Sequence, residues 1–227
     1  KNKNIYGTIR LKHSIEKNYG IKFNHKKIRR YKQLLGLETL KRSKKGLSVS
    51  RAKEKNLVNK AQYLIECNFN SDCFGQKLSS DVSYIKCYDG TLYLSAVKDY
   101  FNDEIVSYST SNNNDVNLIL ESYKNLKLKK DAIINTDQGA VYFAYEYVEL
   151  AQNMDFIRSM SHRGHCWENS PIENWFMQLK HEWLCQFDKI TRKQAKKEIE
   201  KYVQWYNTER IQKKLGYLSP VEYRLKI

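Results

Sequence analysis

The sequence contains no long hydrophobic run. No stretch approaches the about 18–20 consecutive apolar residues of a membrane-spanning helix, and no signal peptide is visible. We therefore expect a cytoplasmic protein without a membrane partner. Proline is scarce, with two residues, and 41% of the residues are hydrophobic, which argues against long disorder. The sequence starts at Lys1 and not at methionine, so whether a further segment precedes it is an open question.

Cysteine is also sparse and without pattern. The five cysteines are odd in number and irregularly spaced, and no Cys-x-x-Cys pair occurs. Reduced thiols are therefore expected rather than a secreted disulfide framework. The nearest candidates for a zinc site are His162, His165 and Cys166, followed by His181 and Cys185. Their spacings match no structural zinc pattern, so ordinary loop and core positions are favoured.

Positive charge predominates and is unevenly distributed. The formal net charge is +15, which favours polyanionic partners, nucleic acid first. Residues 1–60 carry 19 basic and 3 acidic groups, residues 61–180 carry 10 and 16, and residues 181–227 carry 11 and 6. Basic arms suit phosphate contacts, and the acidic centre between them suits cation binding.

The first basic arm predicts two short helices. Leu11 and Ile15 are four apart, Gly20 interrupts the pattern, and a second helix is expected over about 25–35. One face of that helix is basic, with Lys26, Lys27, Arg29, Arg30 and Lys32. This outline is typical of a small helix-turn-helix-like unit that contacts DNA. The alternative is a solvated basic helix without specificity.

The centre of the chain predicts a mixture of strands and helices. Strands are expected over 81–88, 91–97, 104–110 and 132–136 and near 156, with Asp89-Gly90 as a hairpin turn. Helices are expected around 55–67 and over about 115–126, 140–152 and 171–185, and a last one follows Thr191. The fold class is therefore α/β, with three antiparallel strands, two further strands, flanking helices and a small N-terminal helical module.

Three acidic residues occupy positions that such a fold brings together. Asp81 is placed at the start of the first strand, and Asp137 directly follows the buried run 132–136, where sites in α/β sheets form. Glu173 lies in the first turn of the helix that starts at Pro171. Converging carboxylates need a counter-charge, and oxygen ligands suit Mg²⁺ or Mn²⁺. Three unrelated surface acids are the alternative at this point.

Five motifs follow one another in a characteristic order. They are Ile5-Tyr6-Gly7 with the basic helix, Ser80-Asp81-Val82-Ser83-Tyr84-Ile85, Asn135-Thr136-Asp137-Gln138-Gly139, Ser159-Met160-Ser161-His162-Arg163-Gly164 leading into Glu173, and Tyr206-Asn207 through Leu215-Gly216-Tyr217-Leu218-Ser219-Pro220. Over nearly the whole chain they resemble the insertion-sequence transposases of the DDE class, in particular the second-reading-frame protein of the two-frame transposases. The 35 residues between Asp137 and Glu173 are typical of that class. Leu78 and Glu168 depart from its usual Trp and Asp, and neither departure removes a catalytic carboxylate.

The resemblance implies a ribonuclease H-like, retroviral-integrase-like core and a metal-dependent reaction on DNA. Asp81, Asp137 and Glu173 would hold two Mg²⁺ or Mn²⁺ ions that activate the attacking oxygen and stabilise the leaving 3′ oxygen. The implied partners are double-stranded DNA (terminal inverted repeats and target) and further copies of the chain on that DNA. The implied location is the bacterial nucleoid.

Further basic residues are expected to contact DNA. Lys180 is seven positions after Glu173 and so near the same helix face. His162 and Arg163 precede the catalytic helix, and Arg210 lies in the second basic arm. For each, a solvated surface residue is the alternative. The tryptophans spaced eight apart are expected in the core: Trp167, Trp175 and Trp183.

The expected division is a basic DNA-binding module over 1–45, a linker and helix over 46–70, a catalytic core over 71–188, and a basic C-terminal helix and tail over 189–227. The predicted function is 3′-end cleavage and strand transfer at the ends of an insertion sequence. One alternative is a nuclease of the ribonuclease H superfamily that only hydrolyses, and another is a non-catalytic DNA-binding regulator. A tyrosine recombinase is disfavoured because no clear Arg and His set accompanies the 17 tyrosines.

Overall fold

The computed structural model describes residues 5–39 and 59–227, which fall into two compact units. The first unit combines the described part of 1–46 with 205–227, and the second holds the described part of 47–204. Within the described residues, no helix has the length and apolar character needed to cross a membrane. The predicted division at residues 45, 70 and 188 stays a prediction.

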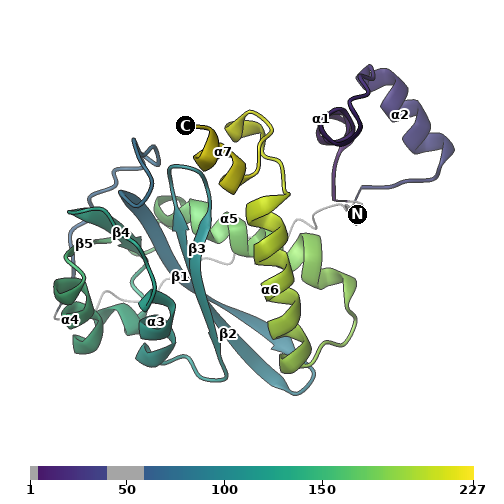
Figure 1. Ribbon diagram of the computed structural model, residues 1–227. Coiled ribbons are helices and arrows are strands. Elements are labelled where there is room, and N and C mark those ends of the chain that lie inside the picture. The colour runs from purple at the N-terminus through teal and green to yellow at the C-terminus, as the bar shows by residue number, and fades with distance from the viewer. Residues whose placement is uncertain (1–4, 40–58) are drawn as a thin grey trace. The chain divides into compact units, whose positions relative to one another are not determined.

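A five-stranded mixed sheet forms the centre of the second unit (Figure 1). Its strands are β1 (Lys77–Cys87), β2 (Gly90–Asp99), β3 (Ile105–Ser111), β4 (Ala132–Thr136) and β5 (Phe156–Met160). The order across the sheet is β3-β2-β1-β4-β5. The first three strands pair antiparallel, and β4 pairs parallel with both β1 and β5. This sheet confirms the predicted set of three antiparallel strands and two further strands.

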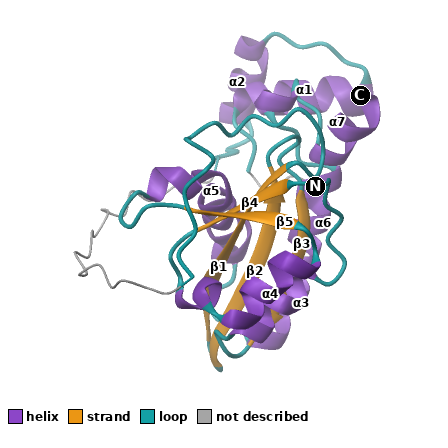
Figure 2. Ribbon diagram, turned by 90° about the vertical axis from the view of Figure 1, so that its left-hand side faces the viewer, coloured by secondary structure: helices purple, strands orange, loops and turns teal. Residues whose placement is uncertain are grey.

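Helices cover both faces of the sheet (Figure 2). In this unit they are α3 (Val116–Tyr123), α4 (Tyr145–Asn153), α5 (Ser170–Gln178) and most of α6 (Arg192–Thr208). Val97 of β2 belongs to the core formed with α3 and α4, whereas the neighbouring Lys98 donates to Pro171 O of α5 at 3.1 Å. Because successive strand side chains point to opposite faces, α5 lies on the face opposite α3 and α4.

The core beneath α3 and α4 explains why these segments fold where they do. Tyr123, Tyr147 and Phe156 are buried there with the apolar side chains of β1 and β4, and the rings of Tyr123 and Tyr147 meet edge to face at 5.8 Å. Such pairs add about 0.5–1.5 kcal/mol beyond area burial. The N-terminus of α3 is capped by Asp115, which accepts from Leu118 N.

The first unit contains α1 (Thr8–Tyr19), α2 (His25–Leu34) and α7 (Pro220–Lys226). Gly20 ends α1 in the left-handed region at φ 68°, and the Asn24 side chain caps α2, so both predicted helices are confirmed. Within this unit the Tyr6 hydroxyl accepts from Ile211 N at 3.3 Å. Sequence reasoning missed α7, although Ser219 and Glu222 form the capping box that starts it.

Two sequence expectations are corrected by the structure. The helix expected around 55–67 is absent from its described part, 59–67, which is loop and turn. Gln62 O accepts there from Met160 N of β5, and Glu66 and Cys67 have positive φ, which an α-helix excludes. In addition, β1 begins at Lys77, so Asp81 lies in the middle of the strand and not at its start.

Candidate active site

Two of the predicted carboxylates stand side by side because of strand register. Ser79 of β1 pairs with Asn135 of β4 in the parallel ladder, and an aspartate follows two residues later on each chain segment. Asp81 therefore lies in β1 and Asp137 directly follows β4, each two residues beyond this pair, and adjacent strands are about 4.8 Å apart. Side-chain alternation along β1 puts Asp81 on the same face as Ser79, the face covered by α5, and the charge of Asp137 acts on both Asp81 and Glu173 there.

Backbone amides hold one oxygen of each aspartate. Asp81 Oδ1 accepts from Val82 N at 2.7 Å, and Asp137 Oδ1 accepts from Gly139 N at 2.8 Å. A Cβ atom at Gly139 would lie 2.9 Å from Asp137 Oδ1, closer than side-chain carbons come to a neighbour. A side chain at this position would therefore push the Asp137 carboxylate aside.

Glu173 reaches the same face from the first turn of α5. The position of that turn depends on Pro171, whose carbonyl oxygen accepts from Lys98 Nζ of β2. Lys98 also pairs with Asp103 at 3.0 Å, and both side chains are almost fully buried. This pair connects the N-terminus of α5 to the end of β2 and so positions Glu173 relative to the sheet.

The three carboxyl groups act electrostatically on one another. Burial raises the pKa of Asp81 well above its ordinary value, and the charges of Asp137 and Glu173 raise it further, against the lowering effects of Val82 N and Lys180. Burial also raises the pKa of Asp137. Burial and the charge of Asp137 raise the pKa of Glu173. The structure thus brings all three predicted carboxyl groups together in a site that disfavours their ionised form.

Lys180 is the positive group beside this cluster. Its Nζ donates to Ser83 Oγ of β1 at 2.7 Å and lies 5.0 Å from the centre of the Tyr84 ring. Burial lowers the pKa of Lys180, and the charge of Asp81 counteracts this. The residue sits in a π-helical turn, Leu179–Trp183, that continues α5, a local widening that is frequent at functional sites. Ser83 was not identified from the sequence as the hydrogen-bond partner of Lys180.

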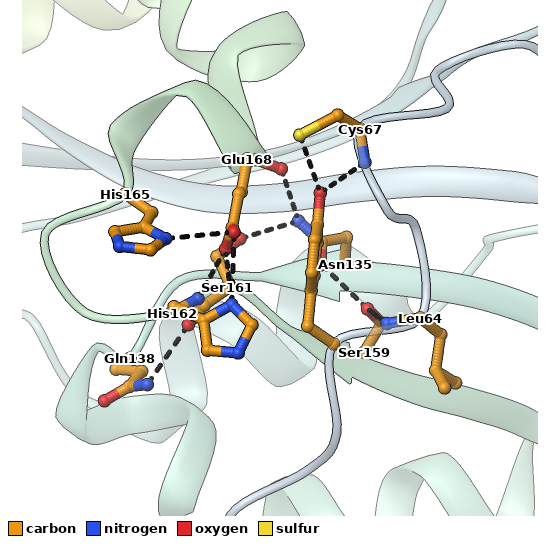
Figure 3. Close-up of polar contacts among 10 residues, drawn as sticks. Leu64, Cys67, Asn135, Gln138, Ser159, Ser161, His162, His165 and Glu168 are labelled. Atoms are coloured by element: carbon orange, nitrogen blue, oxygen red, sulfur yellow. Dashed lines mark hydrogen bonds and ion pairs between the residues drawn. The ribbon is translucent and has the colours of Figure 1, made fainter.

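The segment between β5 and α5 is tied to β4 by a buried amide (Figure 3). Asn135 Nδ2 donates to Ser161 Oγ at 3.0 Å and to Glu168 O at 3.1 Å. The Glu168 carboxylate faces His162 and His165. Burial raises the pKa of Glu168, but the amide of His162 and both rings outweigh it, so the net pKa is lowered. Sequence reasoning placed both histidines in a loop and did not combine them with Glu168.

The remaining predicted DNA contacts divide into exposed and buried residues. The basic residues of α2 are exposed: Lys26, Lys27, Arg29 and Arg30. Arg210 is corrected, because it is only 3% exposed and its guanidinium lies 5.4 Å from the centre of the Tyr206 ring. A residue buried in this way does not present its charge to a phosphate backbone. Trp167 is also corrected, since it is exposed while Trp175 and Trp183 are buried.

Comparison with known proteins identifies the family. Two family models described as integrase core domain match residues 72–166 and 173–227. The chain is 35% identical to an uncharacterized transposase-like protein of Haemophilus influenzae, over 90% of the chain and 94% of that protein. It is 31% identical to the putative transposase InsK for insertion sequence element IS150 of Escherichia coli, over 98% of the chain and 78% of that protein.

Solved structures agree on the fold. The HTLV-2 integrase catalytic core domain in complex with magnesium superposes with a TM-score of 0.52 at 15% identity, over 66% of this chain and 97% of that one. A chain of the simian T-cell lymphotropic virus intasome superposes with a TM-score of 0.56 at 13% identity, over 66% of this chain and 54% of that one. The ribonuclease H-like fold implied by the motifs is thus confirmed. With its integrase-like core and its transposase relatives, this chain belongs to the insertion-sequence transposases of the DDE class.

Proposed function

We propose that this chain is a polynucleotidyl transferase that cleaves the 3′ ends of an insertion sequence and joins them to target DNA. The observation that carries the proposal is the grouping of Asp81, Asp137 and Glu173, in which the charge of Asp137 raises the pKa of the other two. Relatives described as transposases for insertion elements IS150 and IS904 support this reaction class.

The donor set fits two divalent cations, Mg²⁺ or Mn²⁺. Carboxylate oxygens are the ligands that these ions prefer, and a cluster of like charges is unfavourable without them. When bound, the ions activate the attacking oxygen and stabilise the leaving 3′ oxygen. Asp81, Asp137 and Glu173 would hold the ions, and Asp81 is the carboxylate on which the charges of both others act. The magnesium in the HTLV-2 integrase core supports the choice of metal.

The remaining polar residues are assigned to DNA. Lys180 binds the phosphate at the reacting bond, since its ammonium group lies on the carboxylate face of the sheet. His162 and Arg163 contact the duplex ahead of α5, and the exposed basic face of α2 neutralises backbone phosphates. The substrates are the terminal inverted repeats and a target duplex in the nucleoid, with several copies of the chain acting together.

The test uses DNA taken from both sides of the gene that encodes this chain. One labelled duplex carries the uncut element end, a second carries a pre-cut 3′-hydroxyl end, and a supercoiled plasmid is the target, all in Mg²⁺. The variants Asp81→Asn, Asp137→Asn and Glu173→Gln are compared with Asp188→Asn, which changes an exposed carboxylate outside the site.

We expect the three site variants to lose both cleavage and strand transfer while binding the duplex as the wild type does. Asp188→Asn is expected to retain both reactions. Cleavage without joining of the pre-cut end would favour a nuclease instead. Binding without either reaction in the wild type would favour a regulator, and full activity of any site variant would contradict the assignment of that residue.

A further inference from the structure

The segment ahead of α5 contains a second group of metal-ligating side chains, apart from the three catalytic candidates. His162 Nδ1 lies 3.1 Å from both oxygens of Glu168, and His165 Nδ1 lies 3.1 Å from Oε1 of the same carboxylate. One ligand atom from each of the three residues lies within 4.8 Å of the other two. Two imidazole nitrogens therefore converge on one carboxylate (Figure 3).

We propose that His162, His165 and Glu168 bind a transition-metal dication of the Zn²⁺ class. Imidazole nitrogen suits Zn²⁺, whereas Mg²⁺ prefers oxygen ligands alone. With metal–ligand bonds of about 2.0–2.1 Å, neighbouring ligand atoms of a tetrahedral ion stand about 3.3 Å apart. The observed separations of 3.1 Å between nitrogen and oxygen are close to that value. The three ligand atoms lie within 4.8 Å of one another, so rotation of the exposed imidazole rings would bring both nitrogens and the carboxylate around one ion.

The backbone of this segment already holds the ligands in place. His165 N donates to His162 O at 3.2 Å, and Glu168 N donates to His165 O at 2.9 Å. These two consecutive turns advance in steps of three residues, and the second leads into the 3₁₀ turn Cys166–Asn169. Gly164 provides the positive φ of 79° that the first turn requires. Three ligands at i, i+3 and i+6 therefore share one side of the segment.

Neighbouring groups orient the ligands further, as the surroundings of metal sites usually do. Glu168 Oε2 accepts from His162 N at 2.6 Å, and the ring of Trp167 stacks on that of His165 at 4.6 Å. The Glu168 side chain is 7% exposed, whereas those of His162 and His165 are 58% and 46% exposed. The carboxylate forms the base of the site, and the solvent side leaves room for a water ligand.

Bound metal would join the two successive turns between β5 and α5. It would hold a segment whose Glu168 carbonyl is bonded to Asn135, two residues from Asp137, and whose end is the start of α5. The ion is distinct from the proposed Mg²⁺ pair because the two sets share no ligand. Its expected effect is thermal stabilisation of the protein, which can be measured without any DNA substrate.

The test titrates Zn²⁺ into the purified full chain in excess Mg²⁺ with a phosphine reductant, followed by calorimetry. His165→Gln and Glu168→Gln are the site variants, and the glutamine at 168 keeps an oxygen that can accept from His162 N. His181→Gln is the matched control outside the cluster, and Cys166→Ser removes the thiol that follows His165 in the sequence. Circular dichroism melts before metal addition show that each variant is folded.

We expect one Zn²⁺ per wild-type chain, at least tenfold weaker binding in both site variants, and unchanged binding in His181→Gln and Cys166→Ser. Co²⁺ in place of Zn²⁺ should give d–d absorption without a thiolate charge-transfer band. Equal binding by the wild type and His165→Gln would overturn the proposal and leave the contacts as hydrogen bonds only. Loss of binding in Asp81→Asn or Cys166→Ser alone would also overturn it, because the ion would then lie elsewhere.

Discussion

Asp81→Asn should stabilise the protein when no metal is present, although it removes a proposed catalytic group. Burial and the charges of Asp137 and Glu173 raise the pKa of Asp81, so ionising this carboxyl group costs folding free energy. Asparagine has nearly the same shape and keeps the Oδ1 atom that accepts from Val82 N. The substitution therefore removes the repulsion and preserves the local hydrogen bond.

The size of the effect follows from the register of the two strands. If the general strand spacing of about 4.8 Å is taken as the separation of the Asp81 and Asp137 charges, they repel by roughly 3 kcal/mol at an effective dielectric constant of about 20. Partial solvent exposure and the lost attraction of Lys180 reduce the free energy gained by removing this repulsion. Protonation of the Asp81 carboxyl group in the wild type limits that gain further. We expect a net gain of about 1–2 kcal/mol, or about 2–8 °C in Tm for a protein of this size.

Thermal melts in EDTA and in excess Mg²⁺ test this reasoning. In EDTA, Asp81→Asn should melt above the wild type, whereas Asp188→Asn should melt with it. In Mg²⁺ the order should reverse, because ligand at about 100 times its Kd stabilises the wild type by about 2.7 kcal/mol and the variant binds it weakly. If Asp81→Asn melts no higher in EDTA, or if Mg²⁺ stabilises it as much as the wild type, the shared site is refuted.

Three further predictions follow from the same structure. Because the pKa of Asp81 is raised on folding, the wild type loses stability relative to Asp81→Asn as pH rises above the ordinary carboxyl value of about 4. Melts in EDTA across acidic to neutral pH should show this gap widen, and a constant gap would contradict the shift. Gly139→Ala should displace the Asp137 carboxylate and weaken both Mg²⁺-dependent stabilisation and DNA cleavage at least tenfold; unchanged values of both would show that the contact relaxes freely. Charge reversal of Lys26, Lys27, Arg29 and Arg30 should weaken DNA binding and flatten the slope of log K against log salt by roughly one unit per lost phosphate contact. An unchanged slope in filter binding would show that α2 faces away from DNA.

Local patterns in the sequence were sufficient for much of the secondary structure and for the carboxylate candidates. The period-two run and Asp89-Gly90 predicted the β1–β2 hairpin, and Asn24 and Gly20 predicted the ends of α2 and α1. These features depend on residues that are close in the sequence, through side-chain alternation and capping. They can therefore be predicted from short sequence windows. The carboxylates were singled out by motif order and by the spacing from Asp137 to Glu173.

Tertiary structure decided what depends on residues distant along the chain. Pairing of Ser79 with Asn135 sets Asp81 beside Asp137, and this register belongs to the sheet as a whole. Burial of Arg210 and the loop at residues 59–67, where a helix is expected from the sequence, arise from packing and from the hydrogen bond to β5, against local preference. The meeting of His162, His165 and Glu168 depends on two consecutive turns, in which Gly164 has a positive φ and Glu168 O accepts a hydrogen bond from Asn135. A one-dimensional pattern does not specify such contacts, because their free energy comes from groups that only the folded chain brings together.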